Sequence, residues 1–158
     1  MEAILDFDTY YINMLPGIAA KSKDPNTKIG CIIIGSDNEP LSMGYNSFPR
    51  GINDNVPDRY ERPEKYLWIE HAERNAIYNA ARSGIKLKGS KIYLPCLPCM
   101  DCARAIVQVG IVEVIYDDVC QKAWEKTSVK YAPEWKRTRV LFAEAGVRLR
   151  KWTKNKLQ

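Results

Sequence analysis

Apolar positions in the first third of the chain predict one helix followed by a β-hairpin. Between residues 7 and 23 they recur at helical spacing, and Pro16-Gly17 in the middle predicts a kink or a break. The apolar face of this helix comprises Tyr11, Leu15, Ile18 and Ala19. Residues 29–34 and 41–46 are short apolar runs separated by a turn sequence. Together these two runs predict an antiparallel hairpin.

Beyond residue 70 the pattern alternates between helices and strands. Helical spacing predicts helices over 70–82, 100–109 and 134–145, each followed by a glycine suited to a helix end: Gly84, Gly110 and Gly146. Apolar, β-branched runs predict strands over 91–96, 111–116 and 147–152. Strands joined by helices are parallel, with right-handed crossovers. The pattern therefore predicts an α/β layer structure, a mixed five-stranded sheet covered by helices.

Residues 47–66 show neither period and contain three prolines, Pro49, Pro57 and Pro63. An irregular segment of about twenty residues is unusual in a compact domain, where such loops are often functional. We interpret this segment as part of a substrate-binding wall because it leads directly into the histidine motif described below. The alternative is an insertion without a function.

Composition is consistent with one globular domain. The chain has 158 residues, of which 46% are hydrophobic, enough for a real core without a second domain. Its longest apolar runs fall short of the roughly 20 residues that span a bilayer, and its acidic N-terminus lacks the basic region of a signal peptide. Five cysteines, an odd number, do not suggest a secreted disulfide framework. We therefore expect a soluble, cytoplasmic protein without a membrane partner.

The net charge of +5 is modest, but basic residues concentrate towards the C-terminus. They are Lys136, Arg137, Arg139, Arg148, Arg150, Lys151, Lys154 and Lys156. Such a run is typical of a solvated face or of a tail, here from about residue 153. The alternative is a surface for the phosphates of a nucleotide or a nucleic acid. The sequence alone leaves both interpretations open.

The only histidine of the chain stands in His71-Ala72-Glu73, ahead of a Cys-x-x-Cys pair, Cys99 and Cys102. One His and two Cys can supply three zinc ligands and leave the fourth tetrahedral position open, as in catalytic zinc sites. His71 falls in the first turn of one predicted helix and the cysteines at the start of the next. Residues three apart share a helix face, so both thiols can reach one ion.

Glu73 is two residues from His71 and is expected beside the metal without being a ligand. A carboxylate in that place can move protons while zinc activates a water molecule. Hydrolytic removal of an amino group from a cytosine-type ring needs both tasks.

Simpler interpretations exist for each half of this pattern. A lone His is usually a satisfied, partly buried side chain, and a lone Cys-x-x-Cys can be a redox pair or half of a structural zinc site. Cys96 is the one nearby residue able to complete a four-ligand structural site, but we place it at a strand end or in a loop. Cys31 is expected in the core and Cys120 in a loop.

The order His-x-Glu followed by Pro-Cys-x-x-Cys is the signature of zinc deaminases. More narrowly, the chain resembles the deoxycytidylate (dCMP) deaminase family of the cytidine deaminase superfamily. Its short length is compatible with a bacterial or phage member. The resemblance covers about residues 10–152 and rests on four segments: 22–30, 44–51, 71–77 and 98–106. It implies a three-layer cytidine deaminase-like fold and one deaminase domain over residues 1–158.

The resemblance also implies an activity and site roles. The family converts dCMP to dUMP and ammonia, which supplies dUMP for thymidylate synthesis. By motif position His71, Cys99 and Cys102 would hold one catalytic Zn²⁺, and Glu73 would shuttle protons. Substrate contacts would come from the backbone of Ala72 to the pyrimidine edge, from Asn46 to the deoxyribose and from Tyr116 to the sugar or ring. Arg50 is a candidate for the phosphate on charge and position, and an exposed loop arginine is the alternative.

Many members of this family are hexamers activated by dCTP and inhibited by dTTP, with Mg²⁺ accompanying the effector. By this resemblance Gly44, Gly51 and Asp54 are candidates for a regulatory nucleotide site. Three aromatic residues are interpreted either as a subunit contact or as core: Trp124, Tyr131 and Trp135. The competing functions are a nucleic-acid-editing cytosine or adenosine deaminase, supported only by the basic C-terminus, and a noncatalytic zinc domain.

Overall fold

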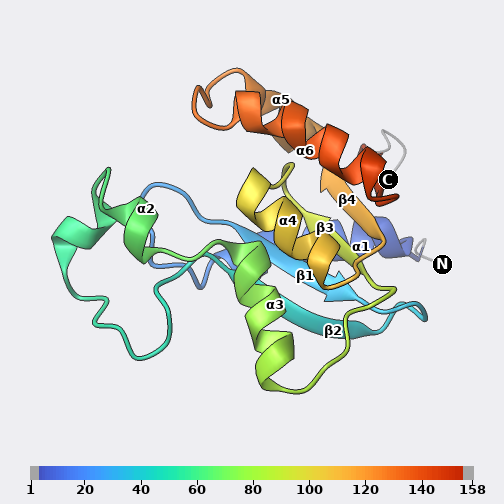
Figure 1. Cartoon of the computed structure of the whole chain (residues 1–158), viewed down its shortest axis with the longest axis horizontal. Coiled ribbons are helices and arrows are strands. Elements are labelled where there is room, and N and C mark those ends of the chain that lie inside the picture. The colour runs from blue at the N-terminus through green and yellow to red at the C-terminus, as the bar shows by residue number, and fades with distance from the viewer. Residues whose placement is uncertain (1–3, 155–158) are drawn as a thin grey trace.

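The computed structural model describes residues 4–154, which form one sheet flanked by helices (Figure 1). The strands are β1 (Gly30–Ile34), β2 (Pro40–Tyr45), β3 (Lys91–Leu94), β4 (Glu113–Asp117) and β5 (Arg148–Trp152). The helices are α1 (Phe7–Ala19), α2 (Lys65–Trp68), α3 (Ala72–Arg82), α4 (Met100–Gln108), α5 (Asp118–Glu125) and α6 (Ala132–Glu144), with a 3₁₀ turn at Pro57–Tyr60.

The five strands lie in the order β2-β1-β3-β4-β5. Strand β1 is antiparallel to both β2 and β3, whereas β3, β4 and β5 are parallel. This arrangement confirms the predicted hairpin, the predicted parallel half and the mixed five-stranded sheet.

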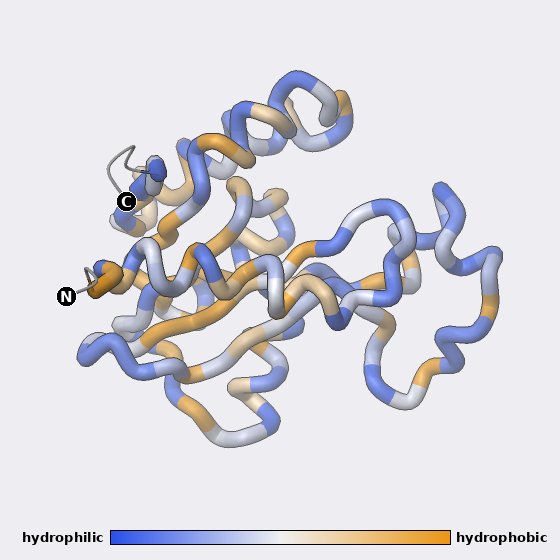
Figure 2. Tube along the Cα trace, turned by 180° about the vertical axis from the view of Figure 1, so that it is seen from behind, coloured by the Kyte–Doolittle hydropathy of each residue, from blue (hydrophilic) through white to orange (hydrophobic). Residues whose placement is uncertain are grey.

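Alternating side chains divide the core between the two faces of the sheet. Ile32, Ile34, Tyr93 and Ile115 pack against α1 on one face. The intervening residues, such as Ile33 and Ile92, pack in a larger cluster with α3, α4 and α6 on the other face. Figure 2 views the molecule from behind, with hydrophobic strands in its interior and hydrophilic outer segments. The result is the predicted three-layer architecture.

Of the kink or break predicted at Pro16-Gly17, the break is wrong, because α1 runs through both residues; it ends at Ala19 rather than at residue 23. The backbone N–H of Ala20 still donates to Pro16 O at 3.0 Å. Pro16 and Gly17 lie on the exposed side, where water can bind the carbonyl that proline leaves without a partner. The buried side carries Tyr11, Ile12, Leu15 and Ile18, whose contact with the sheet stabilises the helix.

The pattern also missed α5 and misplaced several boundaries. We expected Cys120 in a loop, but it lies in α5, which Asp117 caps by accepting hydrogen bonds from the backbone N–H groups of Val119 and Cys120. Helix α6 begins at Ala132 rather than at residue 134, and β4 covers Glu113–Asp117 rather than 111–116. These ends depend on capping and strand pairing, which apolar periodicity does not report.

Part of the basic C-terminal run is held by carboxylates. Arg148 and Arg150 lie in β5, and each forms an ion pair with Glu113 at 2.9 Å. Arg150 also pairs with Asp8 of α1, which joins the N-terminal helix to the last strand. These two arginines are therefore not part of a free tail. Residues 155–158 of the predicted tail lie outside the described residues.

None of the described helices combines the length and the apolar character needed to cross a bilayer.

Helix α3 packs directly on β2, and Gly44 permits this close approach. A Cβ on Gly44 would lie 2.3 Å from Ala72 O and 2.5 Å from Ala76 N, both backbone atoms of the helix. Side chains also bridge the two elements, because Ser42 Oγ donates to Ala76 O and Asn75 Nδ2 donates to Tyr45 O. This contact sets the position of the first turn of α3.

Gly44→Ala should therefore lower the free energy of unfolding by about 1–3 kcal/mol, because the added methyl group must push the α3 backbone away. Chemical denaturation of the variant measures this loss. Gly17→Ala is the matched control, since nothing lies within 4 Å of a Cβ at this exposed helical position. Equal stability of the two variants would contradict the packing role of Gly44.

Candidate active site

The N-termini of helices α3 and α4 lie close together on the face of the sheet opposite α1. His71 is the N-cap residue of α3, one position before the helical turn in which we predicted it, and Cys99 is the N-cap residue of α4. Cys102 follows in the first turn of α4 and is fully buried. The structure thus brings together the three predicted zinc ligands from two separate segments.

The spacing of their donor atoms fits a tetrahedral zinc ion. His71 Nδ1 lies 3.4 Å from Cys99 Sγ and 3.5 Å from Cys102 Sγ. Zinc bonds of about 2.3 Å to sulfur and 2.0–2.1 Å to nitrogen, at tetrahedral angles, place a nitrogen and a sulfur roughly 3.6 Å apart. Within the part of the chain that the structure describes, this is the one such His/Cys/Asp/Glu group. Three protein ligands leave the fourth position open.

The thiol of Cys99 is prepared for metal binding. The hydrogen bond from Cys102, together with that to His71, lowers the pKa of Cys99 to about 4 despite its burial. The thiolate is the form of cysteine that binds metals. By contrast, burial raises the pKa of Cys96, which lines the same cavity but does not belong to the ligand group. The pKa of Cys102 is raised as well, chiefly by its hydrogen bond with Cys99, so position in the ligand group and not pKa distinguishes Cys102 from Cys96.

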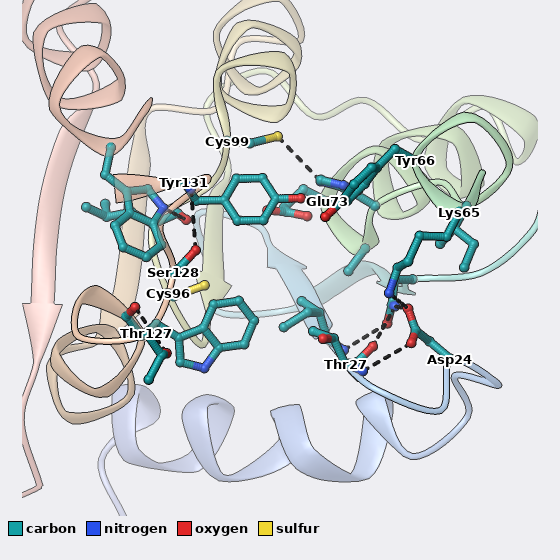
Figure 3. Close-up of a pocket in the computed structure, with 18 of the residues that line it drawn as sticks. Asp24, Thr27, Lys65, Tyr66, Glu73, Cys96, Cys99, Thr127, Ser128 and Tyr131 are labelled. Carbon is teal, nitrogen blue, oxygen red and sulfur yellow. Dashed lines mark hydrogen bonds and ion pairs between the residues drawn. The ribbon is translucent and has the colours of Figure 1, made fainter. Parts of the chain in front are cut away.

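Glu73 lies in the first turn of α3 and points into the site with only 7% of its surface exposed (Figure 3). Burial raises its pKa, while the neighbouring His71 acts in the opposite direction. Its carboxylate is not one of the three grouped ligands. A buried carboxyl group beside a metal site but outside its ligand group is suited to proton transfer, so the role expected of Glu73 stays a prediction that this placement permits.

A cavity of about 260 Å³ opens above these residues. His71, Ala72 and Glu73 line it together with segments that are distant in the sequence. The further lining residues include Asp24, Thr27, Asn46, Arg62, Lys65, Tyr66, Trp124, Ser128 and Tyr131. Arg62 and Tyr66 come from the segment 47–66, which the sequence left irregular but whose last residues, Lys65 and Tyr66, begin α2; part of this segment thus lines the cavity.

Asn46 is held at the cavity by its own amide group. Its Oδ1 accepts from the backbone N–H of Ile29, and its Nδ2 donates to Thr27 O, each at 2.8 Å. Nδ2 also lies 3.4 Å from the carboxylate of Asp24. The structure thus fixes the orientation of Asn46 and leaves one lone pair of Oδ1 and the weaker, longer donor contact for another partner.

Lys65 and Asp24 form a buried ion pair with an Nζ–Oδ2 distance of 2.8 Å. Burial would raise the pKa of Asp24, but the hydrogen bond from Lys65 and those from two backbone N–H groups lower it overall. The pair ties α2 to the segment before β1 across 41 residues of sequence. No sequence pattern identified Lys65 as a residue of the site.

Aromatic residues form the other wall. The ring of Tyr131 lies 6.3 Å from the His71 ring, nearly perpendicular to it, and points towards Glu73 (Figure 3). Trp135 is a core residue, and its indole N–H donates to Leu97 O at 2.8 Å. The sequence left a subunit contact and the core as alternatives for these residues and did not assign Tyr131 to the site.

The remaining predicted residues are more dispersed. Arg50, Gly51 and Asp54 line a second cavity of about 250 Å³, where Arg50 donates to Asn79 and Asp54 pairs with Lys23 at 2.7 Å. Gly44 lines neither of these cavities and instead packs against α3.

Tyr116 is also absent from the linings of both cavities. Its side chain is buried in the core cluster, with its hydroxyl 3.5 Å from Arg139. The structure thus gives no support to the expected contact of Tyr116 with a sugar or ring.

Comparison with known proteins agrees with this geometry. Residues 5–117 match the family model described as the cytidine and deoxycytidylate deaminase zinc-binding region. The chain is 36% identical to human deoxycytidylate deaminase over 154 residues, covering 94% of this chain and 80% of the relative. It is 34% identical to an uncharacterized deaminase of Aliivibrio fischeri over 137 residues, covering 87% of both chains.

A solved structure shares the fold. The dCMP deaminase of cyanophage S-TIM5, in complex with dCMP and dUMP, superposes with a TM-score of 0.71 at 21% identity, covering 96% of this chain and all of that one. From the matched family region, the relatives and the three-ligand site, we conclude that this chain belongs to the cytidine and deoxycytidylate deaminase family.

Proposed function

We propose that this protein is a zinc-dependent hydrolase that converts dCMP to dUMP and ammonia. The observation that carries this proposal is the open group of His71, Cys99 and Cys102 with a buried carboxylate, Glu73, beside it. The named relatives support dCMP as the substrate.

The residues of the site divide the reaction between them. A zinc ion held by His71, Cys99 and Cys102 would supply a water molecule activated near neutral pH. The carboxylate of Glu73 would carry one proton of that water to the pyrimidine ring nitrogen and, in a second transfer, the other proton to the amino group, which departs as ammonia while the water oxygen stays on the ring. The aromatic wall at Tyr131 and the closed floor around Cys102 would exclude bulk water from the pyrimidine.

Substrate contacts form a second part of the proposal. Ala72 and Asn46 line the cavity, which supports a backbone contact of Ala72 with the pyrimidine edge and a contact of Asn46 with the deoxyribose. The contact of Tyr116 with the sugar or ring remains a prediction from family resemblance alone.

Regulation and assembly are proposed on the same resemblance. The second cavity would take an effector nucleotide, dCTP as activator or dTTP as inhibitor, with Mg²⁺. Gly51 and Asp54 line it, and it shares Asn46 with the first cavity, which supports communication between the two. A single deaminase domain over residues 1–158, a hexameric assembly, a cytoplasmic location and a role in supplying dUMP for thymidylate synthesis complete this proposal.

The purified protein should deaminate dCMP, which is measured as loss of the cytosine absorbance. It should deaminate deoxycytidine and a single-stranded oligonucleotide much more slowly. Including dCTP with Mg²⁺ in one arm and dTTP in another tests the effectors in the same assay. Deamination of the oligonucleotide in preference to dCMP would favour a nucleic-acid-editing enzyme. Bound zinc without turnover of any of the three would favour a noncatalytic domain.

His71→Ala should lose zinc and activity together, because two thiolates alone cannot hold the ion in this geometry. Metal analysis should find about one zinc per wild-type chain and well below one in the variant. Cys96→Ala is the matched control, since this thiol lines the cavity outside the ligand group. Loss of zinc from the Cys96 variant would show that the site has a different ligand set.

Glu73→Gln should retain about one zinc and lose activity, because the amide keeps the shape of the side chain but cannot carry the proton. General acid–base catalysis contributes about 10²–10⁴-fold, so kcat should fall by at least 100-fold. Steady-state deamination of dCMP measures the loss, and metal analysis of the same sample is the control. A zinc-loaded variant with near wild-type kcat would contradict the proton-carrying role.

A further inference from the structure

Charges along the active-site cavity are unevenly paired. Lys65 neutralises Asp24 at 2.8 Å, whereas Arg62 lines the cavity as an exposed residue. Over residues 4–154, Arg62 takes part in no salt bridge and donates no hydrogen bond. A cation in this position is available to a ligand in the cavity.

Lys130 is a second cation near the aromatic ring of Tyr66, which Arg62 also approaches. Lys130 Nζ sits 3.1 Å from the ring centroid of Tyr66, and Arg62 Cζ sits 6.0 Å from it. Lys130 is exposed and, like Arg62, has no salt bridge within the described part of the chain. The two cations come from different segments, Arg62 from the loop before α2 and Lys130 from the segment before α6. Arg62 lines the cavity, whereas Lys130 is next to two of its lining residues, Tyr66 and Tyr131.

The position of this pair relative to the metal ligands sets the direction of a bound nucleotide. Lys130 Nζ is 5.2 Å from the ring of Tyr131, and that ring is 6.3 Å from the His71 ring. The ring of Tyr131 is thus near both His71 and Lys130, and Tyr66 and Tyr131 both line the cavity that contains Arg62 (Figure 3). A pyrimidine at His71 and Glu73 would place the other end of a nucleotide towards Arg62 and Lys130.

We propose that Arg62 and Lys130 bind the 5′-phosphate of the substrate at the mouth of this cavity. An arginine guanidinium binds phosphate oxygens in a two-pronged fashion, and a lysine ammonium adds a point charge. This proposal rests on the proposed dCMP deaminase function and defines how that site selects a nucleotide over a nucleoside.

The same observations reassign the phosphate contact that the sequence suggested for Arg50. Arg50 lines the second cavity rather than the first, and its guanidinium already donates to Asn79. Arg62 carries the charge into the cavity that contains Glu73.

Steady-state kinetics of Arg62→Ala, Lys130→Ala and the double variant with dCMP and with deoxycytidine test the proposal. Each single variant should raise KM for dCMP at least tenfold with kcat within about twofold of wild type. The kcat/KM for deoxycytidine, which has no phosphate, should stay unchanged, so the preference for the nucleotide should fall. Calorimetry can compare the binding of the product dUMP with that of deoxyuridine, which lacks the phosphate. The variants should lose affinity for dUMP but not for deoxyuridine, and no turnover is needed for this measurement.

Arg59→Ala is the matched control, because Arg59 belongs to the same loop and lies 3.8 Å over the Trp68 ring without lining the cavity. Arg62→Lys should recover part of the affinity for dUMP, which a variant that had merely unfolded would not do. Unchanged KM and dUMP affinity in the double variant would overturn the proposal, as would a selective loss in Arg50→Ala alone. Wild-type protein that binds neither dCMP nor dUMP would instead reject the proposed function itself.

Discussion

The packing of α3 against β2 and α4 is the constraint on which the site depends. Small residues make it possible: Gly44 has no side chain where α3 crosses β2, and Ala72 and Ala76 are fully buried at the same contact. This packing holds the first turns of α3 and α4 together, so that His71 Nδ1 lies within 3.5 Å of both thiols. The metal site is thus a consequence of how closely two helices pack on one sheet.

The rest of the cavity is built from segments that this core only anchors. The Lys65–Asp24 ion pair joins α2 to the segment before β1 and, through Asp24, supports Asn46. Tyr131 closes the opposite wall from the segment before α6. The rigid centre accordingly carries the reactive groups, whereas the surrounding loops carry the groups proposed to distinguish one substrate from another.

Sequence reasoning predicted the centre of the molecule well and its periphery poorly, for physical reasons. The ligand motif and the sheet were predictable because His71, Cys99 and Cys102 sit at helix starts marked by local periodicity. The break at Pro16 was wrong because tertiary contact on the buried face outweighs one missing hydrogen bond. Lys65 and Tyr131 were missed because only chain folding brings them to the cavity. Helix α5 was missed for a different reason: the capping residue Asp117 was a local signal in the sequence, but apolar spacing does not detect it.

We propose that three protein ligands hold zinc and leave one position open. X-ray absorption at the zinc edge of the purified protein tests this directly, because sulfur and lighter ligands differ in distance. We expect two sulfur atoms at about 2.3 Å and two nitrogen or oxygen atoms at about 2.0–2.1 Å. Three sulfur atoms with a single nitrogen would contradict it, because Cys96 would then close the site as a fourth protein ligand.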